Sequence, residues 1–119
     1  MRKTICGLIG SVCAAHARTR WNKCFSDTGL DAFFDFYRTK TLQDLELRLS
    51  EMFLLERRGY VVSEEFQMLI LPLLDRLDAK AREAGRVDTV TNEGGVLIGN
   101  FLDGDDDQRM SVWFPTILH

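Results

Sequence analysis

Histidine, proline and long apolar runs are scarce in this sequence. It contains two histidines and two prolines, and no run approaches 18 apolar residues, so a transmembrane span is not expected. One histidine, His16, lies in an apolar N-terminal segment, and the other, His119, is the last residue. Both are poor positions for a rigid general base. The sequence therefore predicts a protein that is not an enzyme.

Motifs that bind metals or phosphates are also missing. The three cysteines are an odd number without a C-x-x-C pair, which argues against a disulfide scaffold and leaves no recognisable zinc spacing. We expect them to be free thiols that pack as small hydrophobes in a reducing compartment. The glycines at 94, 95 and 99 have neither the P-loop lysine nor the dinucleotide-binding spacing. The sequence thus predicts no cofactor and no metal.

An acidic loop follows at 103–107, with the sequence Asp-Gly-Asp-Asp-Asp. Its alternating aspartates are similar to the start of a calcium-binding EF-hand loop. The similarity ends at Gln108, where that loop needs glycine, and at Phe114, where it needs a bidentate glutamate. A solvated hairpin loop is the better interpretation.

Charge is unevenly distributed along the 119 residues. The first 26 contain five lysines and arginines and no acid, whereas the remainder carries ten basic and all 18 acidic residues. A chain of this length, 45% hydrophobic and 28% charged, forms one globular domain. We therefore expect a basic N-terminal arm over 1–26 and a single small domain over 27–119.

The arm has four competing interpretations. It is a secretory signal cleaved after residue 17, a transit peptide over 1–26, a retained basic arm, or the first helix of the fold. The Ala15-His16-Ala17 triplet favours the first, the lack of acids the second, and the helical spacing of Ile5, Ile9 and Val12 the last. The alternatives remain open from sequence alone.

Apolar residues recur at helical spacing in three segments. Between Leu30 and Tyr37 they lie at i, i+3, i+4 and i+7, which predicts a helix over 28–38. A leucine-rich stripe after Thr41 predicts a helix over 41–58 that begins with a capping box to Asp44. A longer stripe predicts a helix over 63–84, with Ser63 as its N-cap.

Pro72 lies inside the third helical segment. It removes a backbone hydrogen bond and predicts a kink there, with a break and a new helix near Pro72 as the alternative. Beyond Gly85, alternating β-branched residues and turn residues predict strands near 87–91, 96–102 and 109–114. The predicted fold class is α+β and mainly α. It is a helical bundle with an antiparallel helix hairpin, 41–58 and 63–84, followed by a small C-terminal antiparallel β-meander.

The favoured functional hypothesis is a non-catalytic protein-interaction subunit or adaptor of a larger multi-subunit assembly. We expect a mitochondrial location before a cytoplasmic one, with secretion least favoured. Helix 41–58 is apolar around much of its circumference and would contact other protein subunits together with the acidic loop. The candidate partner surface consists of Leu47, Leu54, Leu55, Asp103, Asp105, Asp106 and Asp107.

Two alternatives come from other classes of protein. One is a small inhibitor encoded by a mobile element, which blocks a host complex through the acidic loop. The other is a nucleic-acid-associated protein that contacts RNA or anionic lipid through residues 1–24. A helix-turn-helix is disfavoured, because the helix after residue 63 begins with Glu64 and Glu65. The candidate contacts are Arg2, Lys3, Arg18, Arg20, Lys23 and the stacking ring of Trp21.

Overall fold

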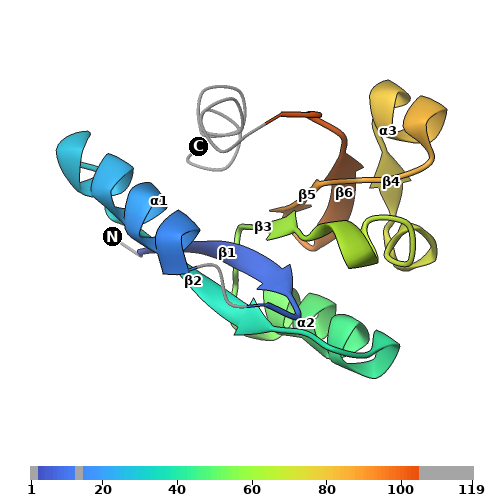
Figure 1. Ribbon diagram of the computed structural model, residues 1–119, viewed down its shortest axis with the longest axis horizontal. Coiled ribbons are helices and arrows are strands. Elements are labelled where there is room, and N and C mark those ends of the chain that lie inside the picture. Colours follow the sequence, from blue (N-terminus) through green and yellow to red (C-terminus); the bar gives the residue numbers. More distant parts are fainter. Residues whose placement is uncertain (1–2, 13–14, 105–119) are drawn as a thin grey trace.

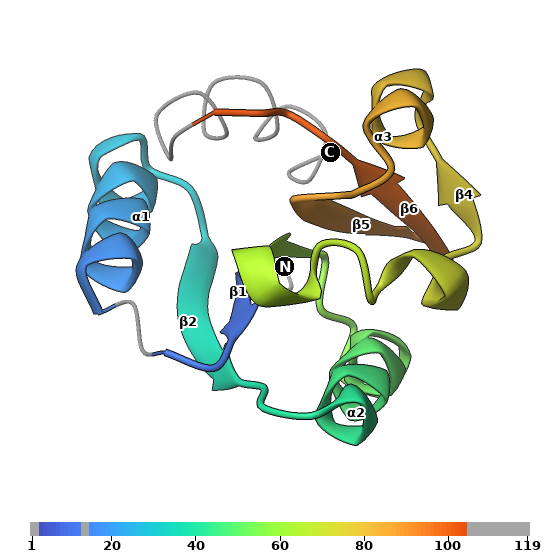
Figure 2. The ribbon, with the colours of Figure 1, turned by 45° about the vertical axis from the view of Figure 1, so that its right-hand side comes forward.

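A six-stranded mixed sheet with three α-helices forms the fold in a computed structural model that describes residues 3–12 and 15–104 (Figures 1 and 2). The strands are β1 (Thr4–Gly10), β2 (Ala32–Arg38), β3 (Gly59–Val62), β4 (Arg76–Leu77), β5 (Thr89–Glu93) and β6 (Val96–Asn100). The helices are α1 (Ala15–Asp27), α2 (Leu42–Leu54) and α3 (Ala79–Ala84), with short 3₁₀ turns η1 (Glu64–Phe66) and η2 (Leu71–Leu73). None of the helices in this part of the chain has the length and apolar character needed to cross a membrane.

The strand order is β2-β1-β3-β5-β6-β4, and only β5 opposes its neighbours. Strand β1 pairs in parallel with β2 and β3, and β4 pairs in parallel with β6. Strand β5 is antiparallel to both β3 and β6. The carboxyl ends of the other five strands therefore share one edge of the sheet with the amino end of β5.

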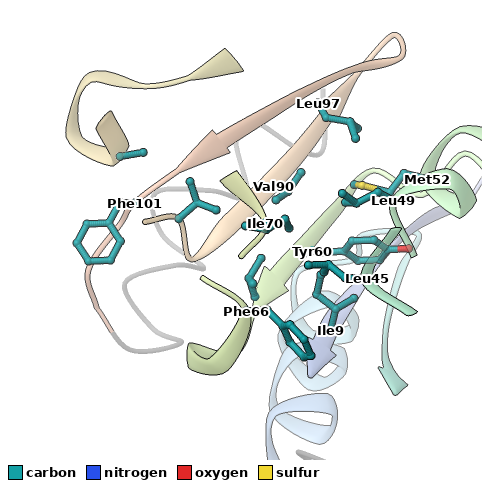
Figure 3. Packing of buried hydrophobic residues seen from close by; sticks show 13 residues of the cluster. Ile9, Leu45, Leu49, Met52, Tyr60, Phe66, Ile70, Val90, Leu97 and Phe101 are labelled. Carbon is teal, nitrogen blue, oxygen red and sulfur yellow. The ribbon is translucent and has the colours of Figure 1, made fainter. Parts of the chain in front are cut away.

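Helices α1 and α2 lie on opposite faces of the sheet. Since alternate residues of a strand point to opposite sides, the same strands contribute side chains to two separate buried clusters. On the α1 side, Cys6 and Val61 belong to a buried cluster completed by Ala17, Trp21, Phe25, Ala32 and Phe34. On the α2 side, Ile9 and Tyr60 lie in the larger cluster that includes Leu45, Leu49 and Met52 (Figure 3). The part of the sheet formed by β2, β1 and β3 thus lies between two helical layers.

The predicted mainly helical bundle is wrong. Segment 28–38 contains strand β2, and residues 4–10 of the expected arm form β1, which lies inside the sheet. A strand that packs against other elements on both faces has a nearly continuous apolar sequence. Such a sequence also contains apolar residues at helical spacing, which is why helices were considered for these segments. The segment 1–26 therefore contributes β1 and α1 to the domain.

The second predicted helix is present, and the third is not. Helix α2 begins with the expected capping box, in which the Asp44 N–H donates to Thr41 Oγ1 (3.0 Å) and the Thr41 N–H donates to Asp44 Oδ2 (3.2 Å). Segment 63–84 instead divides into η1, η2, β4 and α3. Pro72 lies at the start of η2, where its missing N–H is tolerated, so the chain breaks there as in the alternative interpretation.

The predicted strands after Gly85 are partly confirmed. Strands β5 and β6 form an antiparallel hairpin around Gly94 and Gly95, within the region 87–102. They extend the large sheet through the pairing of β5 with β3, so they are not a separate meander. The strand expected near 109–114 lies outside the described residues.

Candidate functional site

The strand order places a switch in chain direction between β1 and β3. From β1 the chain continues through α1 to β2 on one side, whereas β3 is followed by the elements on the other side. In open α/β sheets, ligands bind outside the carboxyl ends of the strands at such a point. The segments that follow Gly10 and Val62 are therefore the first place to look for a site.

Glu65 links these two segments. The backbone N–H and the hydroxyl of Ser11 each donate to Glu65 Oε1 at 2.9 Å, and the Ser63 hydroxyl donates to the same oxygen at 2.8 Å. Burial alone would raise the pKa of Glu65, but these hydrogen bonds outweigh it and lower the pKa to about 2. Gly10 allows the close approach, since a Cβ there would overlap the Ser63 hydroxyl. A fixed negative charge thus lies at the switch point.

A cavity of about 200 Å³, here termed the switch-point cavity, opens at the same edge of the sheet. It lies where β3 and β6 end and β5 begins. Its walls come from segments that are distant in sequence but adjacent in the sheet. The lining residues are Glu64, Gln67, Arg86, Asp88, Phe101, Asp103 and Gly104.

Gln67 carries a side-chain acceptor that has no partner among the described residues. Its side chain Nε2 donates to the Val62 carbonyl (3.1 Å), and its backbone carbonyl accepts from the Val87 N–H (3.0 Å). The residue is only 7% exposed, and its Oε1 is buried without a hydrogen bond to any residue that the structure describes. A buried acceptor left unpaired costs about 1–3 kcal/mol.

Asp88 fixes the chain beside the cavity. It is buried, and its two carboxylate oxygens accept the backbone N–H groups of Leu102 and Asp103, each at 2.9 Å. These bonds turn the chain after β6 so that Asp103 borders the cavity with a left-handed φ of 53°. Residues other than glycine are uncommon in this region of backbone space, and the two hydrogen bonds hold Asp103 there.

Among the described residues that line the cavity, Arg86 alone is positively charged. The Arg86 guanidinium lies over the ring of Phe101, 4.8 Å from its centroid. The Lys80 ammonium is 5.9 Å from the centroid of the same ring but does not line the cavity. The lining thus combines the carboxylates of Glu64, Asp88 and Asp103 with a single guanidinium.

Chemically, the lining offers mainly hydrogen-bond acceptors. Gln67 Oε1 and the carboxylate of the exposed Asp103 suit a ligand that donates hydrogen bonds through hydroxyl groups. A carboxylate open to solvent also serves as a proton acceptor. Over residues 3–12 and 15–104, no group of three or more His, Cys, Asp or Glu side chains is arranged to hold a metal ion.

A larger hollow of about 470 Å³ lies at the opposite, amino edge of the sheet, with Lys3, Arg57 and Arg58 among its lining residues. Its cations already have partners within the protein. Lys3 pairs with Asp31 at 3.2 Å, and Arg57 pairs with Glu51 at 3.5 Å. The Arg58 guanidinium donates to the Asn92 carbonyl. The switch-point cavity, which lies at the carboxyl edge and is lined by Gln67, is therefore the candidate site.

The predicted partner surface does not form one site. Leu47, Leu54 and Leu55 are exposed on and just after α2, by 52%, 78% and 55%. A protein contact through these leucines stays a prediction. Asp103 lines the switch-point cavity instead, and Asp105, Asp106 and Asp107 lie outside the described residues.

Trp21, the ring expected to stack on a base in the predicted nucleic-acid or lipid contact, does not lie on the surface. Trp21 is fully buried, and its ring stacks on Phe34 with centroids 4.7 Å apart, so it is not available to a base. Lys3, Arg18 and Lys23 form exposed ion pairs with Asp31, Asp35 and Asp27. Arg20 is exposed on α1, and Arg2 lies outside the described residues. A contact through these cations stays a prediction.

Sequence reasoning missed most of the residues that line the cavity, among them Glu64, Gln67, Arg86 and Asp88. Asp88 carried a usable signal, because a charged residue interrupts an alternating β-branched segment there. Gln67 carried none, since it fell inside the predicted third helix but outside its apolar stripe. Its role follows only from the position of η1 at the end of β3.

Comparison with known proteins shows similarity to shikimate dehydrogenases. The chain is 33% identical over 104 residues to a shikimate dehydrogenase (NADP(+)) of Bacillus licheniformis, which covers 86% of this chain and 37% of the relative. It is 30% identical over 83 residues to the same enzyme of Streptococcus sanguinis, covering 70% of this chain and 29% of the relative. No protein-family profile matches the chain. The chain thus spans about a third of the length of the curated relatives it matches.

Solved structures show the same fold. A ligand-free 5-ketofructose reductase of a Gluconobacter strain superimposes with a TM-score of 0.81 at 26% identity, over 87% of this chain and 37% of that one. Shikimate 5-dehydrogenase from Listeria monocytogenes, in complex with shikimate and NAD, gives a TM-score of 0.79 at 28% identity. That match covers 85% of this chain and 35% of the other.

These similarities overturn the predicted function. The relatives are oxidoreductases, so the prediction of a non-enzymatic adaptor is wrong, as are its alternatives of an inhibitor and a nucleic-acid-associated protein. The expectation of a helical accessory subunit in a mitochondrial assembly is wrong for the same reason. The chain is related in sequence to shikimate dehydrogenases and shares the α/β fold of about a third of their length.

Proposed function

We propose that this chain binds the substrate of an oxidoreductase related to shikimate dehydrogenases, and that it does so in the switch-point cavity. The observation that carries the proposal is a polar cavity at the carboxyl edge of the sheet, lined by Gln67, whose buried Oε1 has no hydrogen bond to a described residue. This position is where ligands bind in open α/β sheets. The similarity of fold and sequence to dehydrogenases and a reductase supports the same reading.

The substrate is a small molecule with several hydroxyl groups. The Listeria structure holds shikimate, and the Gluconobacter protein is named for a keto sugar. Both compounds carry hydroxyls that donate hydrogen bonds. Gln67 Oε1 and the Asp103 carboxylate are the acceptors that the cavity offers to such groups.

Asp103 is the candidate proton acceptor of the site. In a dehydrogenase that uses NADP(+), as the relatives are named to do, the carbon-bound hydrogen of an alcohol would leave as hydride to the dinucleotide, which residues outside this chain would have to hold, and the hydroxyl proton would leave to a base. A carboxylate that borders the cavity and faces solvent can take that proton and pass it to water. Asp88 acts as a positioning residue, since it holds the Asp103 backbone through a hydrogen bond. Gln67 would orient the substrate without changing its own charge.

The dinucleotide of the relatives does not fit this chain's residues. The sequence has nine glycines, and no two of them are separated by a single residue, so the G-x-G that opens the dinucleotide fingerprint is missing. A cavity of about 200 Å³ is also too small for a dinucleotide. The proposal is therefore restricted to substrate binding and to proton transfer at Asp103.

Binding can be tested by NMR on ¹⁵N-labelled protein. The probes are shikimate, its primary carboxamide, and 5-ketofructose. We expect the Gln67 side-chain amide and the backbone amides of Leu102 and Asp103 to shift on titration, because all three lie at or next to the cavity. The shifts should saturate with one binding constant.

Two matched variants test whether the probes bind in the cavity or elsewhere on the surface. Gln67→Met keeps the approximate volume but removes the acceptor, and should weaken binding by about tenfold or more. Gln43→Met makes the same chemical change at an exposed position of α2 and should bind as the unmodified protein does. The proposal is wrong if no probe shifts the cavity resonances, or if the two variants bind equally well.

A further inference from the structure

We infer that the outer face of helix α2 is the contact surface of a weak, two-fold symmetric dimer of this chain. Helix α2 lies at the periphery of the molecule in both views (Figures 1 and 2). This face shares no residue with the lining of the switch-point cavity, so the inference is independent of the proposed function.

Large apolar side chains are exposed on the outer face of α2. Four of them are exposed by about half or more, namely Leu42, Leu47, Phe53 and Leu54. Leu47 and Leu54 are two helical turns apart and point away from the core, into which the buried residues of α2 point. The face of a surface helix opposite the core is normally polar, so this apolar face marks a contact site.

The exposed apolar area suits contact with a second copy. The exposed parts of the four residues amount to on the order of 400 Å² in each copy, taking roughly 180 Å² for a fully exposed large apolar residue. Two copies would bury on the order of 800 Å² of apolar surface together with a polar rim, which approaches the roughly 1,000 Å² that a specific interface needs. We therefore expect a weak dimer and not a permanent one.

The outer face of α2 is also complementary to itself. A hollow of about 250 Å³ adjoins the helix, bordered by Glu46, Ser50 and Phe53 and by Leu97 of β6. If two α2 helices pack antiparallel with the small Ser50 at their crossing point, Leu54 of each copy lies opposite Glu46 at the border of the other copy's hollow. One surface thus carries both the projecting side chain and the recess, as a two-fold symmetric contact requires.

The charged groups beside this face are compatible with the arrangement. Arg48 and Glu51 lie on the other flank of α2 and pair with each other at 2.6 Å. Asp75 borders the hollow from the side of the sheet, where its carboxylate accepts the Leu97 N–H at 2.8 Å. Glu46 and its copy would lie about 12 Å apart along the helix axis, which exceeds the Debye length of ~8 Å at physiological salt.

Sedimentation velocity between 10 μM and 1 mM tests for the dimer. We expect a dissociation constant on the order of 100 μM, since the interface is small. Leu54→Gln weakens an apolar contact that occurs twice in the dimer and should raise this constant about tenfold or more, and Leu47→Gln should act likewise. The control Val12→Gln changes an apolar residue of nearly equal exposure, 77% against 78% for Leu54, beyond the carboxyl end of β1. It should leave the constant within about twofold.

Disulfide trapping tests the antiparallel orientation. In a Cys13→Ser, Cys24→Ser background, Ser50→Cys places a thiol at the crossing point, where the two Cα atoms lie within the ~7 Å that a disulfide needs. Gln43→Cys is also exposed on α2, but its two copies would lie about 20 Å apart along the axis. We expect oxidation to trap a covalent dimer of the first variant and not of the second.

Three results would overturn the inference. The first is a parent protein that sediments as a monomer at 1 mM. The second is a dimer that Leu47→Gln and Leu54→Gln leave as tight as that of the parent. The third is disulfide formation by Gln43→Cys as fast as by Ser50→Cys, which excludes an antiparallel crossing at residue 50. None of these results bears on the binding of probes in the switch-point cavity.

Discussion

The side chain of Asn22 pairs with both backbone polar groups of Phe34. The Phe34 N–H donates to Asn22 Oδ1, and Asn22 Nδ2 donates to the Phe34 carbonyl, each at 2.7 Å. Strand β2 is the edge of the sheet, and α1 runs beside it (Figures 1 and 2). Asn22 thus takes the place of a neighbouring strand and protects an edge that would otherwise pair with another chain.

Replacement of Asn22 should weaken this edge. Asn22→Leu removes both hydrogen bonds and should lower the free energy of unfolding by about 1–2 kcal/mol. It should also promote self-association, since the edge groups of Phe34 are freed. Urea denaturation and light scattering after size-exclusion chromatography measure the two effects. Asn22→Asp keeps one acceptor and should be intermediate, and a Leu variant as stable and monodisperse as the parent would contradict the account.

Loss of the Asp88 carboxylate should loosen the chain after β6. Asp88→Ala leaves the N–H groups of Leu102 and Asp103 without their acceptor, and should cost about 2–4 kcal/mol of unfolding free energy. Amide hydrogen exchange should accelerate at these two residues. Asp27→Asn, which breaks an exposed ion pair with Lys23, should change stability by less than about 0.5 kcal/mol. Unchanged exchange at Leu102 and Asp103 would show that Asp88 does not hold them.

Acid should remove a stabilising contribution from Glu65. Burial opposes the shift, but the hydrogen bonds from Ser11 and Ser63 lower the pKa of Glu65 to about 2 in the folded protein, against an ordinary value of 4.5. The unfolded chain therefore binds more protons between these values. The stabilisation is complete above about pH 4.5 and is lost as the pH falls towards 2. Because the carboxylate is exposed, its effect should stay below about 1 kcal/mol.

Glu65→Gln tests this dependence on pH. Urea denaturation at pH 7, 4 and 2.5 should show a smaller loss of stability on acidification in the variant than in the parent protein. The same substitution at the exposed Glu46 serves as the control and should leave the pH dependence as it is. Parallel stability curves for Glu65→Gln and the parent would refute the contribution of Glu65.

The buried Cys6 should be protected from thiol reagents. Its side chain is fully buried, its Sγ donates to the Phe33 carbonyl at 3.6 Å, and burial raises the pKa of the thiol. Because the thiolate is the reactive form, iodoacetamide at pH 8 should modify the half-buried Cys24 and spare Cys6 in folded protein. Peptide mass spectrometry reports both sites, and urea should equalise them. Equal rates without urea would mean that Cys6 is accessible.

The elements that sequence reasoning identified correctly are those with local signals. Thr41 and Asp44 are three residues apart, and their capping box forms within one turn of chain. The turn at Gly94 and Gly95 joins two adjacent strands. Strands β1 and β2 were missed because their partners are distant in sequence and because apolar side chains lie on both of their faces, so that no clear alternation marks them.

The amino-acid sequence by itself determined the start of α2, the β5–β6 hairpin and the lack of a dinucleotide fingerprint, since each depends on residues within a few positions of one another. The tertiary structure alone decided that Gln67, Asp88 and Asp103 meet at one cavity. These residues follow β3, precede β5 and follow β6, and only the order and direction of those strands bring them to one edge of the sheet. Pairing between distant strands has no local pattern in the sequence, because it depends on burial that arises only once the whole sheet has formed.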